Sequence, residues 1–337
     1  MRTFLIFILL ILTREIYAKS LFETDFYEIN FISENIETDK INKITNIKYK
    51  SIDKILSNIL IKNDYNIVKK DIDENLINTF IKNIIIEQEK IINNNYYAKI
   101  KVNYKKKSII SYLRKLKLPY LEKIPNQMLI IIFENNFLDN LTFSIHNKYY
   151  NYLNKNNNFY KIPNFDINDK YLLSNIDIEK NFNKNLNIIS KKYSSPDSIL
   201  LVINNDDEIT YNIFLYTNDE LLEVYNTKNI DNDYEYLFNQ IKYETLNKWK
   251  TLNKIQNDFV SLIKCEIKYF NLKELKEIKY NLDNISIIKN IILKKISYKL
   301  NFYDIYYYGD INHLSELFET NRLSINYNNN YCKILLK

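Results

Sequence analysis

Residues 259–267, with the sequence FVSLIKCEI, begin the segment that decides the fold. The run is rich in β-branched and aromatic residues and predicts a strand. Asn271 and Asp310 each precede apolar residues at helical spacing, so we expect each of them to cap a helix. Two strands are expected within residues 285–308 and a last strand within residues 323–336. The order βαββαβ predicts a ferredoxin-like domain over residues 257–337.

The preceding chain predicts two more α+β domains. An N-terminal domain is expected over residues 19–125, and a central sandwich domain over residues 126–256. The N-terminal domain is expected to contain strands at 26–32 and 98–104, a helix at 50–60, a helix or a helix running into a strand at 76–92, and a helix capped by Ser108. The fold class that follows is α+β, with several small α/β sandwich domains.

The central domain begins with the continuous apolar run of residues 128–133, which is typical of a strand covered on both faces. Its other expected elements are a helix capped by Asp177, a hairpin of strands at 198–203 and 209–216, a third strand at 221–225, and a long amphipathic helix at 234–252 that includes Trp249.

The first 18 residues have the pattern of a secretory signal peptide. A basic start, Met1-Arg2, precedes the apolar run of residues 4–12, and small residues occur at Ala18 and Ser20. The run is shorter than the roughly 20 apolar residues of a spanning helix. We therefore expect cleavage after Ala18 or Ser20, export to the periplasm and no integral membrane span in the mature chain. An uncleaved anchor, which would leave the protein membrane-associated, is the alternative.

Composition limits how much meaning single residues carry. The chain has 337 residues, 46% of them hydrophobic, but only one Gly, and it is conspicuously rich in Asn, Ile and Lys. This bias follows AT-rich codons, so Asn and Asp are expected to occupy the positive-φ positions that Gly usually takes. The net charge is +6, and the densest basic cluster, Lys105–Lys107 with Arg114, Lys115 and Lys117, is interpreted as a solvated helix face. No nucleic-acid partner is expected.

The sequence contains few groups with catalytic or metal-binding chemistry. The two histidines, His146 and His313, fall in different expected domains and have no second ligand at metal-binding spacing. A single Gly disfavours a phosphate-binding loop. We therefore expect no metal site, no cofactor and no catalytic residue. The best carboxylate pair is Asp166 and Asp169, which could act as an acid/base pair, although turn and helix-cap chemistry is the favoured interpretation.

The two cysteines, Cys265 and Cys332, fall on the first and last expected strands of the C-terminal domain. In the βαββαβ arrangement the last strand runs antiparallel beside the first, which would bring these residues within bridging distance. A disulfide and a pair of buried thiols both remain open.

Several segments together resemble a bacterial envelope family catalogued as domain of unknown function 2066. They are Glu89 with Tyr97–Val102, Pro119 and Pro125 before Met128–Ile131, Ile162–Asp169 with Leu172-Leu173, and Lys192-Tyr193 with Asp197–Val202. The chain departs from the family pattern at Ile124 and Ile203, where the family has Arg and Gly. The resemblance implies an exported bacterial protein and implies no activity.

These observations give two functional hypotheses. The favoured one is a non-catalytic periplasmic module that binds an envelope protein or a cell-wall component through sheet edges or an aromatic surface. The alternative is an envelope hydrolase that uses Asp166 and Asp169.

Overall fold

A computed structural model describes residues 21–125, 127–134, 147–156, 159–174, 182–205, 208–228, 233–328 and 331–337. The described residues form helices and three sheets, which confirms the α+β class. They divide into two compact units. The first unit contains the described part of Met1–Ile59 together with Asp64–Leu118 and Asn257–Lys337, and the second contains Leu60–Asn63 and Pro119–Gln256.

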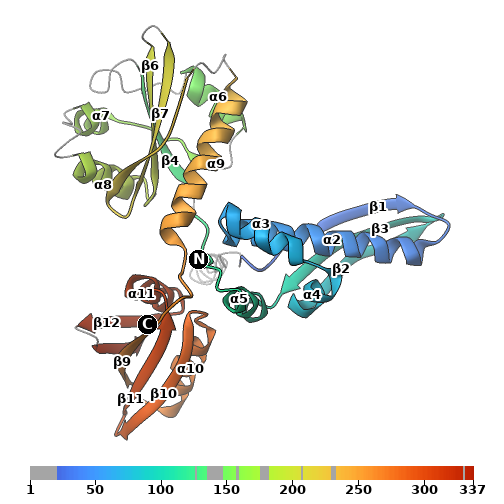
Figure 1. Cartoon of the computed structure of the whole chain (residues 1–337), viewed down its shortest axis with the longest axis vertical. Coiled ribbons are helices and arrows are strands. Elements are labelled where there is room, and N and C mark those ends of the chain that lie inside the picture. The colour runs from blue at the N-terminus through green and yellow to red at the C-terminus, as the bar shows by residue number, and fades with distance from the viewer. Residues whose placement is uncertain are drawn as a thin grey trace, which may run out of the picture. The chain divides into compact units, whose positions relative to one another are not determined.

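The first sheet of the first unit has the antiparallel order β1-β3-β2. Its strands are β1 (Tyr27–Ile32), β2 (Ile81–Ile92) and β3 (Asn95–Tyr104). The helices between β1 and β2 are α2 (Ile36–Ile59), α3 (Lys62–Asp71), whose first two residues belong to the second unit, and α4 (Glu74–Phe80). Alternate residues of β3 from Tyr96 to Tyr104 are buried, as its alternating sequence predicts. Figure 1 shows α2 lying along this sheet.

Two predictions for this region are resolved by the structure. The segment 76–92 is a helix that runs directly into a strand, since α4 ends at Phe80 and β2 begins at Ile81. The prediction that Ser108 caps the next helix is wrong, because α5 (Lys106–Lys115) has Lys105 at its N-cap. The N–H groups of Ser108 and Ile109 both donate to the carbonyl oxygen of Lys105, so the first turn is already formed before Ser108.

The C-terminal sheet of the first unit has the order β10-β11-β9-β13-β12. Its elements are β9 (Val260–Lys268), α10 (Leu272–Asn284), β10 (Ile288–Ser297), β11 (Leu300–Tyr308), α11 (Ile311–Thr320), β12 (Leu323–Asn328) and β13 (Tyr331–Leu336). Asn271 and Asp310 are the N-caps of α10 and α11, as predicted, and each side chain accepts a backbone N–H three residues later.

The end of this sheet differs from the prediction. Two strands follow α11 instead of one, and they pair with each other antiparallel. The chain therefore reverses once more before it reaches β9, and β13 runs parallel to β9. The prediction that the last strand runs antiparallel to the first is wrong, because the segment 323–336 is a hairpin rather than one strand.

The second unit is a sheet of order β5-β4-β6-β7-β8 with helices on both faces (Figure 1). Its elements are β4 (Met128–Glu134), α6 (Lys148–Asn156), β5 (Tyr160–Lys161), α7 (Ile167–Ser174), α8 (Phe182–Lys192), β6 (Ser198–Asn205), β7 (Ile209–Thr217), β8 (Glu220–Lys228) and α9 (Tyr234–Asn253). Strands β5, β4 and β6 are parallel, whereas β6, β7 and β8 are antiparallel. The predicted cap Asp177 lies outside the described residues.

The two faces of this sheet carry separate apolar cores. Ile130 and Ile132 of β4 pack toward α6 and α9, where Trp249 is buried as predicted. Leu129 and Ile131, which point to the other face, pack with residues of α7 and α8. The unbroken apolar run of β4 is explained by this double coverage.

Among the described residues, no helix has both the length and the apolar character that crossing a membrane requires.

Candidate functional site

The predicted carboxylate pair lies at the N-terminus of α7 in the second unit. The Asp166 carboxylate accepts the backbone N–H groups of Asn168 and Asp169, at 2.9 and 3.0 Å from its Oδ1. In return, Oδ2 of Asp169 accepts the backbone N–H of Asp166 at 2.9 Å. The two side chains thus cap the helix reciprocally, which is the arrangement of a capping box.

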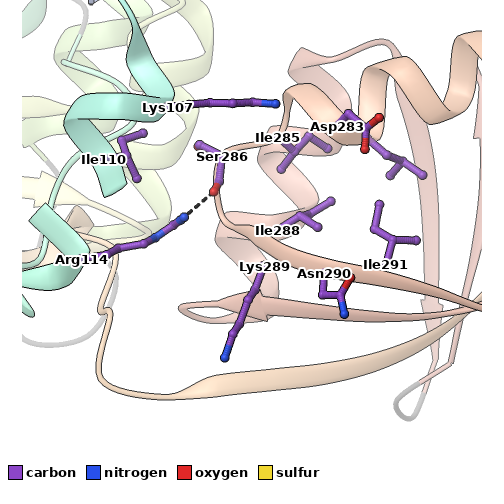
Figure 2. Close-up of a pocket in the computed structure, with 11 residues that line it drawn as sticks. Lys107, Ile110, Arg114, Asp283, Ile285, Ser286, Ile288, Lys289, Asn290 and Ile291 are labelled. Carbon is purple, nitrogen blue, oxygen red and sulfur yellow. Dashed lines mark hydrogen bonds between the residues drawn. The ribbon is translucent and has the colours of Figure 1, made fainter. Parts of the chain in front are cut away.

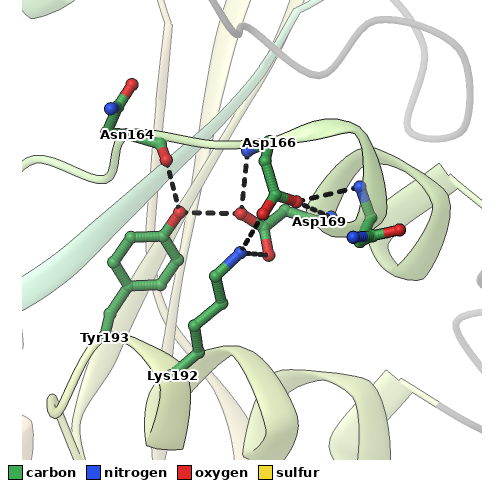
Figure 3. A network of polar contacts seen from close by, with 6 residues as sticks. Asn164, Asp166, Asp169, Lys192 and Tyr193 are labelled. Carbon is green, nitrogen blue, oxygen red and sulfur yellow. Dashed lines mark hydrogen bonds and ion pairs between the residues drawn. The ribbon is translucent and has the colours of Figure 1, made fainter.

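The side chains that complete this network come from the last residue of α8 and from the residue after it (Figure 3). The Lys192 ammonium lies 2.7 Å from Oδ2 of Asp166 and 2.7 Å from Oδ1 of Asp169. The Tyr193 hydroxyl lies 2.7 Å from Oδ2 of Asp169 and 2.8 Å from the carbonyl oxygen of Asn164. Both oxygens of the buried Asp169 carboxylate are therefore satisfied by named partners.

The electrostatics of the network favour a charged, structural role. The Lys192 ammonium, assisted by backbone N–H donors, lowers the pKa of the Asp166 carboxyl. The two carboxylates in turn raise the pKa of Lys192, with Asp166 the larger cause. Burial, followed by the hydrogen bond to Asp169, raises the pKa of Tyr193. A carboxylic acid that donates a proton near neutral pH needs a raised pKa, whereas Asp166 is held ionised.

Of the two histidines, the structure describes only His313. His146 lies outside the described residues. His313 is in the first turn of α11, where its backbone N–H donates to the cap Asp310 and its Nδ1 lies 3.0 Å from Oδ2 of the same residue. Within the described part of the chain, no group of three or more His, Cys, Asp or Glu side chains could hold a metal ion.

The two cysteines form a disulfide in the C-terminal sheet. Cys265 of β9 and Cys332 of β13 are direct partners in the parallel register, with their Cα atoms 4.4 Å apart. Both side chains are buried. The bond joins β9, the central strand of this sheet, to the last strand of the chain, and its buried position is that of a structural crosslink.

A pocket of about 390 Å³ lies in the first unit, between α5 and the segment that joins α10 to β10 (Figure 2). Three of its lining residues are cationic, namely Lys107, Arg114 and Lys289, and one, Asp283, is acidic. The Arg114 guanidinium donates to the carbonyl oxygen of Ser286 at 2.6 Å. Isoleucines at positions 110, 285, 288 and 291 also line the pocket.

The ring of Tyr308 holds two of these cations near the pocket. The Arg114 guanidinium carbon lies 4.3 Å from the ring centroid, and the Lys289 ammonium lies 6.0 Å from it. Such cation–π contacts help to position the two positive charges. The pocket can therefore accept an acidic group next to apolar surface.

The sequence pattern indicated the carboxylate pair. It did not indicate that Lys192 is the counter-ion of this pair, and it did not indicate the pocket. Lys192 is 26 residues from Asp166, and Arg114 is 172 residues from Ser286. Periodicity describes which side of an element is apolar, but it does not report which distant element covers that side.

No protein-family model matches the chain, and no curated protein matches it significantly. The resemblance described above therefore stays a prediction.

Proposed function

We propose that this chain is an exported, non-catalytic binding module of the cell envelope. The observation that carries the export part is the buried Cys265–Cys332 disulfide. Disulfides persist in oxidising compartments and are rare in the cytosol. Together with the leader-like residues 1–18, this bond supports export to an oxidising compartment such as the periplasm.

The binding part of the proposal rests on the pocket around Arg114. Its lining contains three cationic residues, Arg114, Lys107 and Lys289, and one acidic residue, Asp283. A guanidinium that can bind a carboxylate with two donors is well suited to an acidic group. The proposed partner is an envelope protein or a cell-wall component that presents a carboxylate beside an apolar group.

The alternative function, an envelope hydrolase that acts through Asp166 and Asp169, stays a hypothesis without a supporting observation. Both carboxylates cap α7 and pair with Lys192. Catalysis by this pair would require one carboxyl to be released from its cap.

The export part is tested by trapping thiols in living cells with an alkylating reagent, followed by mass spectrometry of the intact protein. We expect Cys265 and Cys332 to be linked and unalkylated. The control is the same chain expressed without residues 1–18, which should remain in the cytosol and become alkylated at both positions. Alkylation of both cysteines in the natural chain would overturn the export proposal.

The binding part is tested with a photoreactive amino acid at Asn290, which lines the pocket. We expect a discrete crosslinked product in intact cells that Arg114→Ala removes. Lys115→Ala is the matched control, because it removes one positive charge from an exposed position of the same helix. A product that survives Arg114→Ala, or the absence of any product, would reject this pocket as the binding site.

A further inference from the structure

Four large apolar side chains stand exposed at one end of the C-terminal sheet. They are Phe270 (75% exposed), Leu272 (69%), Ile296 (68%) and Tyr298 (86%). We refer to these four residues as the apolar tip. Single exposed apolar residues are common on protein surfaces, but a group of them on adjacent loops points to an interaction site.

The backbone holds the two loops of the apolar tip together. Phe270 lies in the β9–α10 connection and Tyr298 in the β10–β11 turn. The backbone N–H of Tyr269 donates to the carbonyl oxygen of Lys299 at 3.1 Å, which ties one loop to the other. The pairing of Lys268 with Leu300 in the β9–β11 register places both loops at the same end of the sheet.

The surroundings of the apolar tip are basic. Lys268 and Lys273 flank Phe270 and Leu272, and Lys295 and Lys299 flank Ile296 and Tyr298. All four lysines are exposed. Residues 288–303 include no acidic residue at all.

An acidic residue in the first turn of α10 is held by the backbone. Glu274 accepts the N–H of Phe270 at 2.7 Å, and its own N–H donates to the cap Asn271. This reciprocal cap fixes Phe270 and Leu272 on either side of Asn271 at the start of α10. This half of the apolar tip is therefore held at a capped helix start, with exposed lysines nearby.

We propose that the apolar tip and its four lysines bind the surface of an anionic phospholipid bilayer. Aromatic and aliphatic side chains at loop ends enter the boundary between headgroups and acyl chains, and Tyr is well suited to that boundary because its ring is apolar and its hydroxyl polar. Lysines beside them are attracted to anionic headgroups. The charge complementarity selects an anionic lipid surface over a neutral one.

This proposal is independent of the pocket around Arg114. It describes peripheral contact by loops, and it requires no helix that crosses the bilayer. It predicts two separable contributions, one from apolar insertion at Phe270 and Tyr298 and one from charge at Lys295 and Lys299.

The test is sedimentation of the natural chain with mixed phosphatidylcholine–phosphatidylglycerol vesicles and with pure phosphatidylcholine vesicles. The measured quantity is the difference in binding between the two lipid compositions. We expect a clear preference for the mixed vesicles that weakens as sodium chloride rises. Phe270→Ser with Tyr298→Ser should weaken that preferential binding at least about tenfold. Lys295→Gln with Lys299→Gln should weaken it roughly tenfold or more and flatten its salt dependence.

The matched control is Ile167→Ser with Tyr171→Ser on α7. Those side chains are 81% and 70% exposed, but they stand beside Asp166 and Asp169. This variant should bind the mixed vesicles as the natural chain does.

Three outcomes would overturn the proposal. They are equal binding to both vesicle compositions, unchanged preference in the Phe270→Ser, Tyr298→Ser variant, and a vesicle-free dimer that the same variant dissociates in sedimentation velocity. The last outcome would identify a second copy of the chain as the occupant of the apolar tip. Far-ultraviolet circular dichroism verifies that each variant is folded.

Discussion

At the scale of single residues, the scarcity of Gly leaves several tight turns to other residue types. Asn93-Asn94 and Asn218-Asp219 have positive φ at the β2–β3 and β7–β8 turns, which confirms that Asn and Asp take this role. The left-handed region is also occupied by residues that disfavour it more strongly, among them Lys117 and Lys299. Replacing such a residue with Gly is therefore expected to raise the free energy of unfolding.

Lys117 offers the clearest test of this point. Its φ is 55°, and it stands at the end of α5, where the N–H of Leu118 donates to the carbonyl oxygen of Leu113. This is the position after a helix C-cap where Gly is preferred. We expect Lys117→Gly to raise the free energy of unfolding by about 0.5–1 kcal/mol, measured by urea denaturation. Lys115→Gly removes the same charge at the last residue of α5 and should lower the free energy of unfolding, by at most about 1 kcal/mol.

Asp169 is the residue on which the α7 cap depends. Its buried carboxylate accepts from the Asp166 backbone and contacts Lys192 and Tyr193. We expect Asp169→Ala to lower the free energy of unfolding by about 2 kcal/mol, because it removes a cap and leaves buried polar groups unsatisfied. Asn168→Ala, at an exposed neighbouring position, should change stability little. If Asp166→Ala with Asp169→Ala left the melting temperature unchanged but abolished a cellular phenotype, the capping interpretation would fail and the hydrolase hypothesis would gain support.

At the scale of elements, the C-terminal sheet shows how one extra reversal changes a topology. The order βαββα was predicted correctly up to α11, and its two N-caps are in place. The final segment then forms the β12–β13 hairpin, so that β13 meets β9 in parallel. Cys265 and Cys332 still face each other, because direct register partners lie close in either orientation.

The disulfide is expected to stabilise this sheet substantially. It closes a segment of 67 residues, for which the loss of chain entropy in the unfolded state corresponds to about 4 kcal/mol. We expect a reducing agent to lower the free energy of unfolding of the purified protein by about 4 kcal/mol, which is measured as a lower midpoint of urea denaturation. A Cys265→Ala, Cys332→Ala variant is the control, since its midpoint should be low and insensitive to the reductant. A natural chain that responds no more than this variant would show that the bond contributes little.

At the scale of the whole molecule, the two units use their apolar residues differently. The central sheet of the second unit is covered on both faces, which requires the unbroken run of β4. In strand β3 of the first unit, by contrast, only every second residue is buried.

Cleavage of the leader is the prediction that belongs to this scale. Small residues at Ala18 and Ser20 follow the apolar run of residues 4–12. We expect mass spectrometry of the protein from cells to find an N-terminus at Lys19 or close to it. Intact residues 1–12 in the membrane fraction would contradict cleavage and support an anchored form. Replacing Ala18 by a bulky residue, as in Ala18→Trp, should retain the leader and provides the comparison.

The sequence by itself determined the local structure of much of the described chain. The caps Asn271 and Asp310, the alternation of β3 and the continuous run of β4 all report periodicities of two or 3.6 residues and hydrogen bonds within a few residues. Only the tertiary structure decided which distant groups meet. Lys192 forms an ion pair with Asp166, and Arg114 donates a hydrogen bond to the carbonyl oxygen of Ser286. Strand β13 pairs in parallel with β9. These contacts depend on how apolar faces and strand registers fit across long chain separations, and the local pattern of the sequence specifies each face but not its partner.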